Sequence, residues 1–297
     1  MSMMKLINLL IGSLLFTQAE AVAVTMGSVS NNTFLNLPTI NVGTENQSLF
    51  TDLLDSDLAR ASFNNQTIFI GSEQVSANNQ NPFAISFVNN TIQWFVDSYE
   101  TGGADGRGVG LVWDGGQEFY AAFAVDGGGS GIESLTTNGW LNSYGMGGGT
   151  RSTVLARLDA TTGQQTGVLN GMGTFINAIL NNGRSNSLIP TGLSLDNQGN
   201  VFLSANSFFG PRGIDRTRME EVDVSGGSPF RTLTVFDSTL NTAQSACAEG
   251  WIDPNTNPNF CAEQGFGVAS VHESSPVMGL IILGSLILFH RRFIRLS

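Results

Sequence analysis

Short runs of alternating apolar and polar residues, separated by turns rich in Gly and Asn, occupy most of the chain. Three of these runs share one plan of strand, turn and second strand, at residues 82–95, 110–122 and 190–204. An alternation with period two is typical of half-buried strands, and short Asx or Gly turns between such strands indicate hairpins. The pattern therefore predicts an all-β domain.

Two further hairpins are predicted, one over residues 154–169 and one over residues 221–236, where Ser225-Gly226-Gly227 would form the turn. Helical spacing of apolar residues occurs over residues 51–62, which predicts a helix there. A short helical turn is expected over residues 173–180. No other segment of the middle region has a long helical period.

The three matching hairpins carry a strand–Asp-x-x-Gly–strand pattern, clearest from Gly192-Leu193 through Asp196 and Gly199-Asn200 to Phe202. Units of this kind resemble the blades of β-propellers, in which small sheets stack radially. The resemblance implies a degenerate β-propeller, because the units begin at the irregularly spaced residues 82, 110 and 192. A β-sandwich, which has similar short strands, is the alternative.

The N-terminus has the three-part layout of a secretory signal peptide. Lys5 precedes an apolar run over residues 6–16, and the small residues of Ala19-Glu20-Ala21 suit a signal peptidase. Ala21-Val22-Ala23 is a second possible cleavage site. We therefore expect residues 1–21 to be a signal peptide and residues 22–271 to form the exported domain.

Residues 272–297 have the features of a membrane segment. An apolar run over residues 277–289 is followed by a basic tail that includes Arg291 and Arg292. Thirteen residues are short for a membrane span, although flanking residues can extend it. Arginines are enriched on the cytoplasmic side, so the domain is expected outside and the tail inside.

The motif before this run is Val271-His272-Glu273-Ser274, and Ser275-Pro276 follow it. Together with the apolar run and the Arg cluster, the motif resembles the PEP-CTERM sorting signal of bacterial surface proteins. Val271 and Glu273 match that family's pattern, whereas His272 and Ser274 replace its prolines. The resemblance implies localisation at the cell surface or outer envelope, and recognition of the tail by an exosortase at the membrane.

Charge and missing residue types exclude several classes of function. Nine arginines and 22 acidic residues lie between residues 22 and 271, a net charge of −13, so nucleic acid is not an expected partner. The two histidines, His272 and His290, lie in the tail, and Lys5 is the only lysine. The middle region therefore cannot build a Ser-His-Asp or Cys-His nucleophile or an imidazole zinc site, and no cofactor is expected.

The remaining chemistry is that of carboxylates, aromatic rings, arginines and two cysteines. Trp140 and Tyr144, in a Gly-rich stretch, are candidates for stacking on sugars. Arg212, Arg216 and Arg218 form the densest charged patch together with Asp215, Glu220 and Glu221, a mix that is typical of a self-neutralising surface network. Candidates for a glycosidase pair, none of them singled out by the sequence, are Asp97, Glu100, Asp105, Asp114, Glu118, Asp126 and Glu133.

Cys247 and Cys261 are the only cysteines, and export permits their oxidation. We expect them to form a disulfide, because two thiols without a nearby histidine fit zinc poorly. Asp114, Asp159 and Asp196 begin turns, where Asp usually accepts hydrogen bonds from its own backbone.

These observations predict an exported, non-enzymatic surface or extracellular-matrix protein. The alternative is a carbohydrate-binding or carboxylate-dependent glycan-active protein. The expected partners are the membrane, an exosortase-type sorting enzyme, and a surface polysaccharide or an envelope protein.

Overall fold

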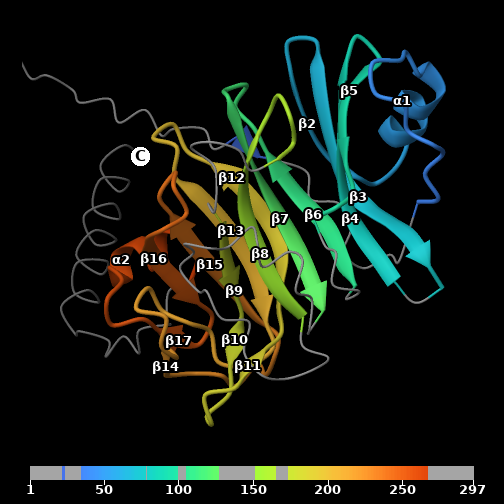
Figure 1. The fold of residues 1–297 in the computed structure, drawn as a ribbon. Helices are drawn as coiled ribbons and strands as arrows, with labels where there is room; N and C mark the ends of the chain where they lie inside the picture. Colours follow the sequence, from blue (N-terminus) through green and yellow to red (C-terminus); the bar gives the residue numbers. More distant parts are fainter. Residues whose placement is uncertain are drawn as a thin grey trace, which may run out of the picture.

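The structure is a computed structural model that describes residues 22–23, 35–77, 79–99, 105–126, 151–164 and 173–266, with only the backbone for residues 22–23 and 173–175. Three antiparallel sheets and a small two-stranded sheet make up most of it (Figure 1). The prediction of an all-β domain is confirmed.

The N-terminal sheet is a four-stranded meander in which each strand pairs with the next. Its strands are β2 (Ala59–Phe63), β3 (Gln66–Ser76), β4 (Asn79–Val88) and β5 (Thr91–Val96). Asn89 and Asn90 join β4 to β5 with φ values of 50° and 64°. Two positive φ angles suit a two-residue hairpin turn, and Asn tolerates them. The predicted hairpin over residues 82–95 is confirmed.

A helix covers the outer face of the N-terminal sheet. Helix α1 (Gln47–Leu54) begins after Asn46, whose side chain accepts a hydrogen bond from the Leu49 amide. Leu49 and Leu53 pack against the buried rings of the sheet, which include Phe69 and Phe87. The helix predicted over residues 51–62 is therefore shorter and earlier than expected, because residues 59–63 pair with β3 as a strand.

The central sheet is a second four-stranded meander, formed by β6 (Gly106–Val112), β7 (Glu118–Asp126), β8 (Arg151–Asp159) and β9 (Gly173–Ile176). The predicted hairpin over residues 110–122 is confirmed by the pairing of β6 with β7. For the hairpin predicted over residues 154–169, the return strand lies outside the described residues.

A small two-stranded sheet follows the central sheet. Its strands are β10 (Ala178–Ile179) and β11 (Ser185–Asn186). The helical turn predicted over residues 173–180 is wrong, because β9 pairs with β8 and β10 pairs with β11.

The C-terminal sheet has seven strands in the order β1-β12-β13-β15-β16-β17-β14. The confirmed hairpin over residues 190–204 forms β12 and β13. The predicted hairpin over residues 221–236 is wrong, because β14 pairs with β17 instead of β15. The strands are β1 (Val22–Ala23), β12 (Leu188–Leu195), β13 (Val201–Ser207), β14 (Glu220–Glu221), β15 (Phe230–Phe236), β16 (Ala243–Ala248) and β17 (Trp251–Ile252).

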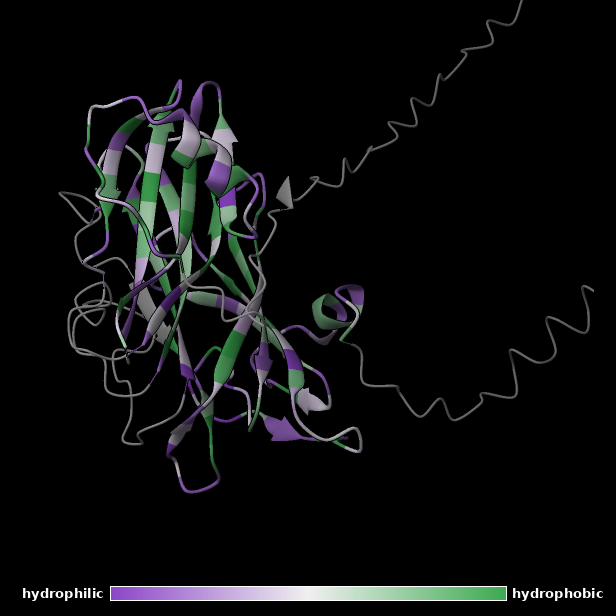
Figure 2. Ribbon diagram, turned by 90° about the vertical axis from the view of Figure 1, so that its right-hand side faces the viewer, coloured by the Kyte–Doolittle hydropathy of each residue, from purple (hydrophilic) through white to green (hydrophobic). Residues whose placement is uncertain are grey.

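One strand of each later sheet lies against the preceding sheet. Strand β6 lies against β2, β3 and β4, and β12 lies against β6, β7 and β8 (Figure 1). Two glycines permit the first approach, because a Cβ atom on Gly108 would lie 2.7 Å from the carbonyl oxygen of Gly71. Figure 2 shows hydrophobic stretches along the strands and hydrophilic residues in many connecting turns.

The segments expected to direct export have no described structure. Residues 1–21, which include Ala19 and Ala21, and residues 267–297, which include the sorting motif from Val271 to Pro276 with Arg291 and Arg292, lie outside the described residues. Among the residues that are described, no helix is both long and apolar enough to cross a membrane.

Candidate functional site: a groove on the outer face of the C-terminal sheet

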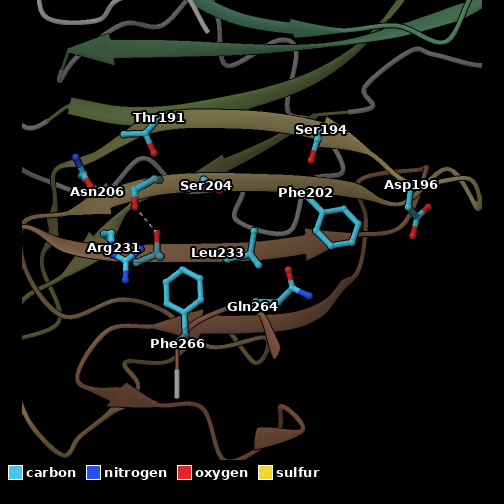
Figure 3. Close-up of a pocket in the computed structure, with 12 residues that line it drawn as sticks. Thr191, Ser194, Asp196, Phe202, Ser204, Asn206, Arg231, Leu233, Gln264 and Phe266 are labelled. Carbon is cyan, nitrogen blue, oxygen red and sulfur yellow. Dashed lines mark hydrogen bonds between the residues drawn. The ribbon is translucent and has the colours of Figure 1, made fainter. Parts of the chain in front are cut away.

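A groove of about 710 Å³ crosses β12, β13 and β15 on the face turned away from the central sheet. Figure 3 shows its lining side chains along the three strands, with Gln264 and Phe266 facing them from beyond β15. The lining residues are Thr191, Ser194, Asp196, Phe202, Ser204, Ala205, Asn206, Arg231, Thr232, Leu233, Gln264 and Phe266.

The alternation of β13 divides its residues between the core and the groove. Val201, Leu203 and Ala205 are buried and pack in the main core. Phe202, Ser204 and Asn206 point to the opposite face, as successive residues of a strand must, and remain partly exposed. The same repeat unit that resembles a propeller blade thus supplies both a core strand and the floor of the groove.

The far wall of the groove is held by a disulfide. Cys247 of β16 and Cys261 of α2 (Pro258–Glu263) are bonded, with their Cα atoms 5.5 Å apart, so the predicted disulfide is confirmed. Phe260, Cys261 and Phe266 pack against Leu233 and Cys247. This packing fixes the segment that carries Gln264 and Phe266 above β15.

Two charged side chains at the groove have partners of their own. Arg231 donates to Glu249 at 3.2 Å, and its guanidinium carbon lies 5.4 Å from the centre of the Phe266 ring. Asp196 accepts from the backbone amides of Gln198 and Asn200 in its own turn, each at 2.8 Å. These contacts hold the two charged side chains at the ends of the groove.

Several uncharged polar side chains of the groove, unlike the charged ones, have no hydrogen-bond partner within the described part of the chain. Those of Ser194, Ser204, Asn206 and Gln264 make no hydrogen bond to other residues in the described part of the chain. A hydroxyl and a primary amide each both donate and accept. Beside the rings of Phe202 and Phe266, the groove therefore offers several neutral hydrogen-bonding groups to a ligand.

The groove contains few groups of the kinds that act in hydrolysis or hold a metal ion. Asp196 is the only carboxylate among its described lining residues, and it is engaged in its turn. A glycosidase needs two carboxyl groups flanking the bond that is cleaved. No group of three or more His, Cys, Asp or Glu side chains among the described residues could hold a metal ion.

Two of the candidate carboxylates meet at one end of the central sheet. Arg107 lies 3.9 Å from Asp105 and 3.6 Å from Asp126, and Arg151 donates to Asp126 at 2.8 Å. Burial lowers the pKa of Arg107, and Arg151 adds to this effect, while Asp126 and Asp105 oppose it. Because each carboxylate faces an arginine, this cluster is an ion-pair network and lacks a free acid–base pair.

The other described candidate carboxylates each have a partner or a charged neighbour of their own. Glu118 pairs with Arg157, and the Asp114 carboxylate accepts from the Gly116 amide at 2.9 Å. Asp97 lies close enough to Glu73 to add to the rise in the pKa of Glu73, which burial causes first. Glu100 and Glu133 lie outside the described residues.

The aspartates predicted to cap turns do so. Besides Asp114 and Asp196, Asp159 accepts from the amides of Thr161 and Thr162 at 2.7 and 3.0 Å. Burial raises the pKa of Asp159, but the hydrogen bonds from Thr161 and Thr162 outweigh it and hold the pKa below its usual value.

The predicted charged patch is tied into the fold. Arg212 donates to the carbonyl oxygens of Asn177 and Arg216 at 3.2 and 2.7 Å. Arg218 pairs with Glu221 at 3.1 Å. These contacts favour a structural role for the group.

Two tryptophans of the strand regions lie in the core. Trp94 and Trp113 are buried, at 6% and 8% exposure. The two sugar-stacking candidates, Trp140 and Tyr144, lie outside the described residues. The groove residues were not selected from the sequence, although the partly polar alternate positions of residues 201–207 were a usable signal.

Comparison of the sequence with protein-family models and with curated proteins found no match. The chemistry of the groove therefore has to be inferred from its own residues.

Proposed function

We propose that the chain is an exported, non-enzymatic surface protein whose folded domain binds a neutral glycan in the groove of the C-terminal sheet. The observation that carries this proposal is that two phenylalanine rings, Phe202 and Phe266, line the same groove as several neutral hydrogen-bonding side chains. A sugar presents both an apolar C–H face and hydroxyl groups, which match these two kinds of contact.

The groove has the dimensions of a ligand site. Its volume of about 710 Å³ falls within the usual range of roughly 300–1,000 Å³ for small-molecule sites. Because neighbouring strands lie about 4.8 Å apart, the three strands of its floor span about 10 Å. That width suits a short stretch of a polysaccharide lying across the strands.

Export and sorting belong to the same proposal. The signal peptide, the variant sorting motif and the basic tail support presentation at the cell surface or outer envelope. In this proposal an exosortase-type enzyme recognises the tail at the membrane. Mass spectrometry of the mature C-terminus tests this part, and an intact Arg295-Leu296-Ser297 end would exclude cleavage.

We also propose that the three larger sheets are the blades of an open, degenerate propeller. Three features support this reading: the N-terminal and central sheets each contain four strands that pair in chain order, β12, β13, β15 and β16 lie side by side in the C-terminal sheet, and β6 and β12 each meet the preceding sheet. An experimental structure would test it, since a sandwich would pack only two sheets face to face.

Glycan binding can be tested with the purified exported protein on an array of neutral and acidic oligosaccharides. The proposal expects a neutral glycan to bind with micromolar affinity. Phe202→Ala should weaken binding at least ten-fold, equivalent to about 1.4 kcal/mol. Phe209→Ala is the matched control, because Phe209 is also exposed but does not line the groove.

Folding of Phe202→Ala should be verified by circular dichroism, because Phe202 also contacts the small core beneath α2. Asn206→Ala provides a second variant that leaves this core intact. The proposal is wrong if no glycan binds below millimolar concentration, or if both groove variants bind as well as the wild type. Turnover of a glycoside lost in groove variants would instead indicate an enzyme.

A further inference from the structure

A second cavity, of about 570 Å³, lies at the opposite face of the C-terminal sheet, near the turn between β10 and β11. Phe230 lines it, whereas the next residue, Arg231, lines the groove. Because successive strand residues point to opposite faces, the two cavities are separate. The apolar lining residues are Ile179, Leu180, Phe208, Phe209, Val224, Phe230 and Trp251.

Trp251 is the central residue of this cavity. Its side chain is 5% exposed, and the Phe230 ring meets it edge to face at 5.5 Å between centroids. The guanidinium carbon of Arg218 lies 4.4 Å from the centre of the Trp251 ring. These contacts fix the indole in one position in the cavity wall.

The Trp251 indole Nε1–H has no hydrogen-bond partner among the described residues. Two other buried tryptophans differ, because Trp94 donates to the Ala160 carbonyl at 3.0 Å and Trp113 donates to the Gly116 carbonyl at 2.8 Å. A buried donor without an acceptor costs about 1–3 kcal/mol. Because this nitrogen is buried, an acceptor carried by a ligand reaches it only when the neighbouring side chains move aside, and the new hydrogen bond would then remove that cost.

The polar residues at the cavity restrict the charge of a ligand. Arg218 is paired with Glu221 at 3.1 Å, so these two charges balance each other. Asn181, Asn182 and Ser228, the other polar lining residues, are neutral. Phe209 is 42% exposed, which provides an apolar surface for an entering ring.

We propose that this cavity binds a small, neutral, ring-containing molecule with a hydrogen-bond acceptor, and that the Trp251 indole Nε1–H donates to that acceptor. The ring would pack among Leu180, Phe209 and Phe230. A neutral ligand is preferred because an anion would meet Glu221 and a cation would meet Arg218.

The test uses benzamide, benzoate and toluene as probes, with the indole N–H signals of the ¹⁵N-labelled protein as the readout. Benzamide should shift the Trp251 signal with a Kd of 1 mM or lower. The signals of Trp94 and Trp113, whose donors are already paired, should stay in place. Trp251→Phe assigns the signal by removing it.

Benzamide should bind at least five-fold more tightly than toluene, which lacks an acceptor, and than benzoate, which is charged. Phe209→Ala should weaken benzamide binding at least three-fold, and this exposed position is expected to tolerate the change. Phe202→Ala, in the separate groove, is the matched control and should leave the benzamide Kd unchanged.

Three results would overturn the proposal: no shift of the Trp251 signal at 10 mM benzamide, equal binding of toluene and benzamide, or an unchanged Kd in Phe209→Ala. Tighter binding of benzoate would overturn the preference for a neutral ligand.

Discussion

Replacing both Cys247 and Cys261 with alanine should lower the stability of the domain and weaken the groove at the same time. Cys247 is only 2% exposed, so alanine is preferable to serine, which would bury a hydroxyl group. The disulfide joins α2 to β16, and the segment that follows α2 carries Gln264 and Phe266 over β15. One covalent bond therefore affects both quantities.

The expected size of the stability change follows from the loop that the disulfide closes. The cysteines are separated by 14 positions. Closing a loop of about 15 residues restricts the unfolded chain by about 3 kcal/mol at 25 °C. For a domain of this size each 1 kcal/mol shifts the Tm by about 2–4 °C, so the double variant should melt about 6–12 °C below the wild type.

Calorimetry of the oxidised protein, the reduced protein and the double variant measures this shift, and titration with the bound glycan at 20 °C measures the affinity. The affinity should fall at least five-fold. Phe266→Ala is the matched control, because it removes part of the groove wall and keeps the disulfide. That variant should lose affinity with a smaller change in Tm.

Two results would refute this reasoning. A Tm difference below 2 °C would mean that loop closure does not stabilise the domain. An unchanged glycan affinity in a folded double variant would mean that the segment following α2 is not part of the binding site.

Four further predictions test the fold and the export signals. Gly108→Ala should destabilise the domain by about 1–3 kcal/mol in urea unfolding, because the new methyl group would meet the backbone of Gly71. An unchanged midpoint of urea unfolding would argue against the close approach of the two sheets. Asp159→Asn should be less stable than the wild type at pH 7, and the difference should vanish as the pH falls through the lowered pKa of the folded Asp159, since only the carboxylate gains from its turn. Glu73→Gln should be more stable than the wild type at pH 7 and equal to it near pH 3. The raised pKa of Glu73 means that folding disfavours its charged form, and this penalty grows as the pH rises above about 4.3. Equal stability of the two proteins at both pH values would contradict this. N-terminal sequencing of the exported protein should begin at Val22, because cleavage after Ala23 would remove β1 from the edge of the C-terminal sheet.

The hairpins that could be predicted from the sequence have their strands and their turn in one short segment. Asn89-Asn90 supplies two residues that tolerate positive φ, and Asp196 accepts hydrogen bonds from its own turn. In both cases the partner strand follows within a few residues. The turn chemistry and the strand pairing therefore agree locally, and the alternation of side chains is enough to find the core face.

The predictions that failed depended on pairing with distant or unexpected partners. The strand beginning at residue 221 was expected to pair across Ser225-Gly226-Gly227, but Glu221 pairs with Trp251 of β17 instead. The amides of Val222 and Asp223 both donate to the Gly250 carbonyl, so the backbone closes against that turn. The residues near position 221 do not identify β17 as the pairing partner, because β17 lies about thirty positions further along the chain.

The two proposed sites differ in how much of each the sequence reveals. The floor of the groove follows from the alternation of β13, and its wall follows from the disulfide, yet only the fold brings Phe266 within reach of Phe202. The proposal for the Trp251 cavity rests on an indole N–H that has no acceptor among the described residues. No sequence pattern shows whether a buried donor will find an acceptor. Both sites are built from rings, hydroxyl groups and amides that the strands and the disulfide hold in place on two opposite faces of the C-terminal sheet.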